Sequence, residues 1–214
     1  MKKRFLKVAF LGISAIALVG CNSKNVTITA DKAKDNEIIV TDNGKIQSVI
    51  KEKFDKKYYD EKELKSFIKD DLKDFNKDND TKIKLNSMKV KDENVYAVID
   101  YKSAEEYNQY GDARITVMKA DLAKDSSVVP DKLNIYGKDK KENKFETLDK
   151  DMKVVVIQEK PVGDTPYGDM PSESKVDLKV TVAGKIKYVS NAKKDDGNTA
   201  KISSLKDPVV VVYK

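Results

Sequence analysis

The side chains that could carry out chemistry in this chain are oxygen acids and amines, because the sequence contains no histidine and a single cysteine, Cys21. Ser-His-Asp and Cys-His catalysis need an imidazole whose pKa lies near neutral pH, so neither can be built here. Zinc sites, which usually combine Cys and His ligands, fail on the same ground. The glycine-rich loops that hold dinucleotides or nucleotide phosphates are also missing. Carboxylate chemistry, a Ser-Lys pair or a site for a hard cation remains, and we expect no cofactor.

Four oxygen-bearing side chains alternate along the chain towards the end of a predicted helix: Asp74, Asn76, Asp78 and Asp80. Alternation of this kind suits Ca²⁺, which takes about six to eight oxygen ligands. The match to an EF-hand loop is incomplete, because Asn79 stands where that loop has Gly and Leu85 stands where it has a bidentate Glu. A solvated helix end that runs into a polar turn is the simpler interpretation, with Ca²⁺ binding as the alternative.

A second candidate site is the long connection over residues 159–175, between two predicted strands. It contains three prolines and two glycines, which make it stiff and exposed, and loops of this length often carry binding residues. Four side chains near its tip form a possible binding loop: Asp164, Tyr167, Asp169 and Met170. The two aspartates could formally act as an acid and a base, but a glycosidase needs a defined carboxylate separation that a sequence does not give. A hairpin loop without a partner is the alternative.

The first 20 residues are typical of a secretory leader. A basic start is followed by an apolar run from Val8 to Val19 that only Gly12 and Ser14 interrupt. The run is too short to span a bilayer, which takes about 20 apolar residues. The leader then reaches the sequence Leu18-Val19-Gly20-Cys21.

These four residues resemble the lipobox of bacterial lipoproteins, in which the cysteine thiol is diacylated and the leader is cleaved before it. The resemblance implies that residues 1–20 are a lipoprotein signal peptide and that Cys21 carries the lipid. Two acyl chains anchor a protein stably, since each buried methylene contributes about 0.8 kcal/mol. We therefore expect a protein that is lipid-anchored on the outer, extracytoplasmic face of the cell membrane. An ordinary signal peptide or an uncleaved N-terminal anchor is the alternative.

The body of the chain also resembles small uncharacterised lipoproteins of anaerobic Gram-positive bacteria, in its lysine-rich and arginine-poor composition and its C-terminal valine run. No activity comes with that resemblance. The whole chain has 42 Lys and Arg against 36 Asp and Glu, but four of the basic residues precede Cys21, and Arg114 is the only arginine after the leader. Nucleic-acid binding would favour arginines and one basic face. The alternating charges instead predict a solvated surface of mixed sign and no nucleic-acid partner.

Local patterns predict most of the secondary structure. Asn43-Gly44 between two β-rich runs predicts a hairpin. Asp60 and Glu63 have the spacing of a capping box and predict a helix over residues 61–76, whose apolar side chains form one stripe. Further elements are expected at residues 82–91, 94–101, 103–110 (a short helix), 114–119, 153–158, 176–182, 186–189 and 209–213.

This order predicts an α+β fold, in which one long amphipathic helix packs on an antiparallel sheet and an all-β C-terminal half follows. We expect a flexible tether over residues 21–36 and an α+β domain over residues 37–135. Residues 145–214 then form a β-rich domain or a continuation of the same core.

Two pairs of tyrosines are the remaining aromatic clusters, Tyr58-Tyr59 and Tyr107/Tyr110. Tyrosine can stack on sugars, but the sequence contains no Trp, which weakens that interpretation. Packing in or at the rim of a core is the commoner use of tyrosine and is what we expect for these four.

Three classes of function fit the sequence. The first is an anchored lipoprotein that binds a protein or an envelope polymer without catalysis, which the missing catalytic side chains favour. The second is a carboxylate enzyme acting on glycans or other envelope material, which predicts two acids in a cleft and a raised pKa for one of them. The third is a solute-binding lipoprotein, which the chain length and the lack of βαβ alternation disfavour.

Overall fold

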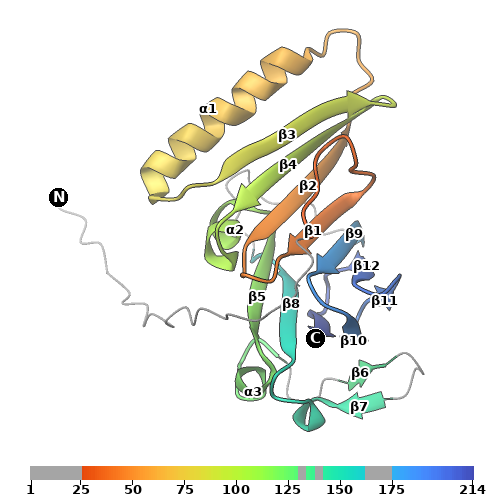
Figure 1. Ribbon diagram of the computed structural model, residues 1–214. Helices are drawn as coiled ribbons and strands as arrows, with labels where there is room; N and C mark the ends of the chain where they lie inside the picture. Colours follow the sequence, from red (N-terminus) through yellow and green to blue (C-terminus); the bar gives the residue numbers. More distant parts are fainter. Residues whose placement is uncertain (1–25, 130–133, 138–141, 162–174) are drawn as a thin grey trace, which may run out of the picture.

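The computed structural model describes residues 26–129, 134–137, 142–161 and 175–214. Strands make up 44% of these residues and helices 20%. The strands form two sheets, a seven-stranded sheet A and a six-stranded sheet B (Figure 1).

Sheet A has the strand order β11-β12-β9-β1-β2-β4-β3. Its strands are β1 (Asn36–Val40), β2 (Ile46–Lys53), β3 (Lys84–Lys91), β4 (Asn94–Tyr101), β9 (Lys175–Val182), β11 (Lys193–Lys194) and β12 (Thr199–Ser204). The predicted hairpin at Asn43-Gly44 is confirmed: β1 and β2 pair antiparallel, and Gly44 supplies the positive φ, +80°, that its turn needs. On its other side β1 pairs parallel with β9, so strands from both halves of the sequence share this sheet.

Sheet B has the order β5-β8-β13-β10-β6-β7. Its strands are β5 (Ala113–Lys119), β6 (Asn134–Tyr136), β7 (Glu142–Lys144), β8 (Lys153–Glu159), β10 (Ile186–Ser190) and β13 (Val209–Tyr213). The valine-rich β13 lies between β8 and β10, and every one of its residues is buried. A run of four valines can be buried on both faces in this way only inside a sheet.

The helical elements are α1 (Glu61–Asn79), α2 (Ala104–Tyr110), α3 (Ala120–Ala123) and the 3₁₀ turn η1 (Phe145–Thr147). Asp60 caps α1, because its side chain accepts hydrogen bonds from the backbone N–H groups of Lys62 and Glu63. The helix runs beside the edge strand β3 (Figure 1), and Leu72 is its one buried residue.

The largest core lies between the two sheets. Ile38 and Val40 of β1 share one hydrophobic cluster with Val180 of β9, and this cluster continues into sheet B through Val155 and Val211. All five side chains are at most 2% exposed. A second cluster covers the other face of sheet B, where side chains of α3, β6 and η1 pack on β8 and β13.

The predicted fold class is wrong. The chain is mostly β rather than α+β, and the main layer on sheet A is sheet B, not a helix. The expected all-β C-terminal half does not stand apart either, because β9 and β12 belong to sheet A and β5 belongs to sheet B. Hydrophobic spacing identifies the strands but carries no information on which distant strands pair, and this explains the error.

A short segment before β1, which we call the strap (residues 28–34), lies on the face of sheet A that sheet B leaves open. Ala30 and Ala33 are fully buried there against Val49, Tyr96 and Val98. The Lys91 ammonium holds the strap by donating to the carbonyl oxygens of residues 31 and 33, at 2.8 and 2.6 Å. Part of the segment expected as a flexible tether is therefore packed on the sheet.

Candidate functional site

Three aromatic rings form a cluster where the chain passes from β2 to α1; we call it the aromatic cap (Phe54, Tyr58 and Tyr59). The ring centroids of Phe54 and Tyr59 are 4.9 Å apart, and those of Tyr58 and Tyr59 are 5.0 Å apart with the planes at 79°. Tilted and edge-to-face pairs at these distances are favourable for aromatic rings. Tyr58 is nevertheless 78% exposed and Tyr59 42% exposed. The cap is therefore an ordered but open aromatic surface.

The base of the cap is fixed by the fold. Phe54 packs against the cluster of Met88 and Val95 in sheet A, which Leu64 of α1 also joins. Its backbone N–H donates to the carbonyl oxygen of Glu93, in the turn between β3 and β4, at 2.8 Å. Tyr59 therefore packs on a ring that is tied both to the core and to the backbone, and Tyr58 packs on Tyr59.

The expectation of core or rim packing is confirmed for one tyrosine pair and wrong for Tyr58. Tyr107 and Tyr110 are buried, and the Tyr110 hydroxyl donates to the Asp71 carboxylate at 2.7 Å. Tyr58 instead projects its ring into solvent. The sequence does not reveal this exposure, because tyrosine is used both for packing at a core and for exposed binding surfaces.

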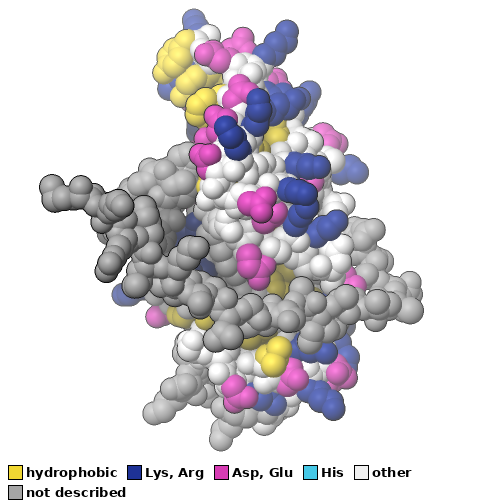
Figure 2. All heavy atoms as spheres, turned by 90° about the vertical axis from the view of Figure 1, so that its left-hand side faces the viewer, with side chains coloured by type: hydrophobic (Ala, Val, Ile, Leu, Met, Phe, Trp, Pro, Cys, Tyr) yellow, Lys and Arg dark blue, Asp and Glu magenta, His cyan; other side chains and the backbone are white. Residues whose placement is uncertain are grey.

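The surroundings of the cap carry both signs of charge. Residues 53–63 contain four lysines and four carboxylates. The Asp55 carboxylate lies 3.4 Å from the Lys56 ammonium, and both side chains remain exposed. Figure 2 shows hydrophobic side chains gathered at the upper left of this face, with Lys, Asp and Glu side chains beside and below them. The segment that carries the cap thus holds equal numbers of basic and acidic side chains.

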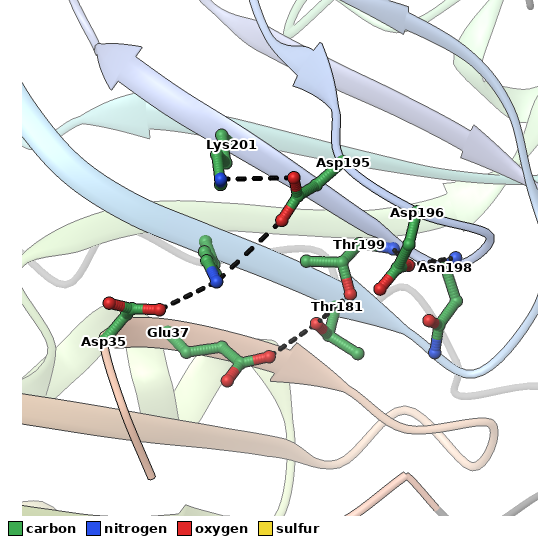
Figure 3. Close-up of polar contacts among 9 residues, drawn as sticks. Asp35, Glu37, Thr181, Asp195, Asp196, Asn198, Thr199 and Lys201 are labelled. Atoms are coloured by element: carbon green, nitrogen blue, oxygen red, sulfur yellow. Dashed lines mark hydrogen bonds and ion pairs between the residues drawn. The ribbon is translucent and has the colours of Figure 1, made fainter.

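A polar cluster occupies another part of the described surface, on the strands β9 and β12 and the segments beside them (Figure 3). The Lys179 ammonium lies 2.7 Å from the Asp35 carboxylate and 3.9 Å from that of Asp195. Lys201 reaches the other oxygen of Asp195 at 3.1 Å. The hydrogen bond from Lys179 lowers the pKa of Asp35, and the same bond raises the pKa of Lys179. A carboxylate stabilised in its charged form in this way is a poor general acid near neutral pH.

Hydroxyl groups continue this cluster on the same strands. The Thr181 hydroxyl donates to Glu37 and lies 2.8 Å from the Thr199 hydroxyl. Both threonines are buried, at 5% and 9% exposure. Asp196 accepts from the backbone N–H groups of Asn198 and Thr199 at 2.9 Å. These bonds join β1, β9 and β12, so the cluster's evident task is to hold that side of sheet A together.

Asp112 is the one carboxyl in the described part of the chain whose pKa is clearly raised. Partial burial raises the pKa, although the residue keeps an exposed surface, and the charge of Lys160 opposes the shift. The neighbouring charge is thus an amine rather than a second carboxylate. A glycosidase needs two acids about 5–10 Å apart, and Asp112 supplies one.

The structure does not gather the possible Ca²⁺ ligands into one site. The Asn76 amide is engaged by the chain, because its oxygen accepts from the Thr81 hydroxyl and the Ile83 N–H while its nitrogen donates to the Ile83 carbonyl, each at 2.8 Å. Asp74, Asp78 and Asp80 are exposed. Within the described residues, no group of three or more His, Cys, Asp or Glu side chains is placed to hold a metal ion.

Two other predicted sites lie outside the described residues. These are the lipidation site Cys21 and the possible binding loop with Asp164, Tyr167, Asp169 and Met170. Among the residues that are described, no helix is long and apolar enough to cross a membrane.

The chain matches no protein-family model, no curated protein and no solved structure. Its function has to follow from its own residues.

Proposed function

We propose that this chain is a membrane-anchored extracytoplasmic lipoprotein and that its body is a non-catalytic binding module. The lipobox-like sequence Leu18-Val19-Gly20-Cys21 supports the anchor. The aromatic cap supports the binding, and its partner is a protein or an envelope polymer.

The observation that carries the proposal is the exposure of Tyr58 on a rigid base. A ring that is 78% exposed leaves most of its apolar surface in water, yet it is held edge-on to Tyr59 rather than folded into the core. Tyrosine is enriched among the residues that dominate binding energies, because it covers a large area with few rotatable bonds. Phe54 orders the cluster before any partner arrives, which lowers the entropic cost of binding.

The strap limits where such a partner can be. The Ile28 N–H donates to the Gln47 side chain of β2, so six residues separate Cys21 from this contact with sheet A. An extended chain spans at most about 3.3–3.6 Å per residue, so Ile28 lies within about 25 Å of the acylated cysteine. A partner in the envelope, close to the membrane, fits this short reach.

A carboxylate enzyme is the second candidate, and the raised pKa of Asp112 is the observation that favours it. The binding module is preferred because the charge beside Asp112 is an amine, Lys160, rather than the second carboxylate that a glycosidase needs. Asp35 is no substitute as an acid, because the bond from Lys179 lowers its pKa.

Retention of envelope components tests the binding proposal. The mature chain, residues 21–214, is immobilised and exposed to a solubilised envelope fraction. We expect retention by the wild type, at least tenfold less retention by Tyr58→Ala, and wild-type retention by Tyr136→Ala, which alters a tyrosine that is 43% exposed on β6. Equal retention by both variants and the wild type would contradict a role for the cap.

A further inference from the structure

We infer that the ligand of the aromatic cap is carbohydrate, a neutral polysaccharide whose sugar rings lie against Tyr58 and Tyr59. This inference rests on the proposed binding function and names the ligand of that same surface.

The charge balance around the cap selects against charged polymers. The four lysines of residues 53–63 are matched by four carboxylates. Nucleic acids and anionic lipid surfaces are held by an excess of positive charge, which this segment does not have. A neutral ligand meets no net repulsion and needs no counter-charge.

The chemistry of the cap matches the two kinds of surface on a sugar. Pyranose rings present C–H groups that can lie against an aromatic ring, and hydroxyl groups around their edge that both donate and accept hydrogen bonds. The exposed ring of Tyr58 offers the apolar surface. In the same segment the Asp55 carboxylate can accept hydrogen bonds, the Lys56 ammonium can donate them, and the tyrosine hydroxyls can do both. The side chains of Lys56 and Asp55 are 54% and 36% exposed, which leaves them open to ligand hydroxyls.

The size of the cap favours sugars over a protein partner. An aromatic side chain covers about 150–250 Å² when it is fully buried, so the two tyrosines alone match a contact with sugar rings, whereas a protein partner, which buries about 800 Å² on each side, would also have to cover the charged side chains around them. A short run of sugars needs a binding surface no larger than one or two aromatic rings. Phe54 packs on the core and holds this small surface in place, so little entropy is lost in ordering it when a ligand binds.

Calorimetric titration of the mature chain with two neutral probes tests the inference: cellohexaose and the β-1,4-linked hexamer of N-acetylglucosamine. We expect saturable binding of at least one probe, about tenfold weaker in Tyr58→Ala and nearly unchanged in Tyr58→Phe, which keeps the ring. Tyr136→Ala is the matched control and should bind like the wild type. Thermal unfolding of each variant is measured alongside, and all should unfold near the wild-type temperature because both tyrosines are exposed.

The outcomes separate this inference from the proposed function. If neither hexamer binds while retention of envelope proteins depends on Tyr58, carbohydrate recognition is overturned and the binding module stands. Vesicles of phosphatidylglycerol bound through Tyr58 would also overturn it, in favour of a lipid surface. If neither the hexamers, the vesicles nor the envelope fraction responds to the loss of Tyr58, both the inference and the proposed function fail.

Discussion

Tyr58 meets Tyr59 edge-to-face, with 5.0 Å between the ring centroids, and the outer ring of the pair is the most exposed of the large hydrophobic side chains in the described residues. This relationship separates the cap from ordinary rim packing, in which the outer ring would lie flat on the core. Phe54 supports the pair from below and is itself tied to the β3–β4 turn. The cap thus lies in the connection between β2 and α1, and Phe54 ties that connection to the β3–β4 turn, which orders the surface before a ligand binds.

Replacing Cys21 by alanine should release the protein from the membrane, because the thiol that the lipobox-like sequence supplies for acylation is lost. Detergent phase partitioning checks this: the wild type should enter the detergent phase and Cys21→Ala the aqueous phase. Mass spectrometry of the mature N-terminus is the companion measurement. An unacylated N-terminal residue in the wild type would contradict the anchor.

Replacing Lys91 by methionine should loosen the strap, because two backbone carbonyls lose the ammonium that bonds them at 2.8 and 2.6 Å. We expect a loss of about 1–2 kcal/mol in the free energy of unfolding and faster proteolysis within residues 26–36. Lys84→Met, at an exposed position at the other end of β3, is the control and should change neither. Equal proteolysis of the two variants would show that Lys91 does not hold the strap.

Much of the local structure is predictable from the sequence. The start of α1 follows from the capping spacing of Asp60 and Glu63, and the β1–β2 hairpin follows from Asn43-Gly44. Both depend on residues a few positions apart. The parallel pairing of β1 with β9 joins residues about 140 positions apart, and nothing in either strand specifies the other. The α+β prediction is wrong for this reason.

The candidate site was less accessible to sequence reasoning. The strap is hidden in the sequence because its buried residues are alanines among polar neighbours, which gives no hydrophobic signal. The cap is hidden because a Tyr-Tyr pair is compatible with burial and with exposure. In the polar cluster, Lys179 and Lys201 are cross-strand partners, which can be recognised once the register of β9 and β12 is known.

Replacing Lys179 by methionine should destabilise the fold in a pH-dependent way. The pKa of Asp35 is lowered by the bond from Lys179, so the folded state favours the charged carboxylate. Such a contribution is present above the usual carboxyl pKa of about 3.9 and is lost as the pH falls through the lowered value. Urea unfolding should therefore show a lower free energy of unfolding for Lys179→Met than for the wild type at pH 7, by about 1 kcal/mol or less, and a smaller difference at pH 2.5.

The exposed Lys206 supplies a control for that experiment, since Lys206→Met removes the same charge away from the cluster. It should match the wild type at both pH values. If Lys179→Met lowers the free energy of unfolding as much at pH 2.5 as at pH 7, lost packing and not the ion pair explains the loss.

Replacing Asp112 by asparagine should change stability with pH in the opposite sense to Lys179→Met: the variant gains relative to the wild type as the pH rises. Burial raises the pKa of Asp112, so the folded state disfavours its charged form and the residue costs stability once the pH rises above the usual carboxyl value. The difference in unfolding midpoint, Asp112→Asn minus wild type, should therefore be more positive at pH 7 than at pH 3. A lower relative midpoint at pH 7 would show that the charge of Lys160 outweighs the burial of the carboxylate.

The most direct test of the binding module is the reactivity of Tyr58 while the protein is bound. The mature chain is mixed with the envelope fraction and labelled by hydroxyl radicals, and oxidation is read at Tyr58 and, as the internal reference, at the exposed Tyr136 of β6. If the aromatic cap is the binding surface, oxidation of Tyr58 falls severalfold in the bound protein while that of Tyr136 stays constant. Bound protein in which Tyr58 is oxidised as fast as in the free protein would contradict the account.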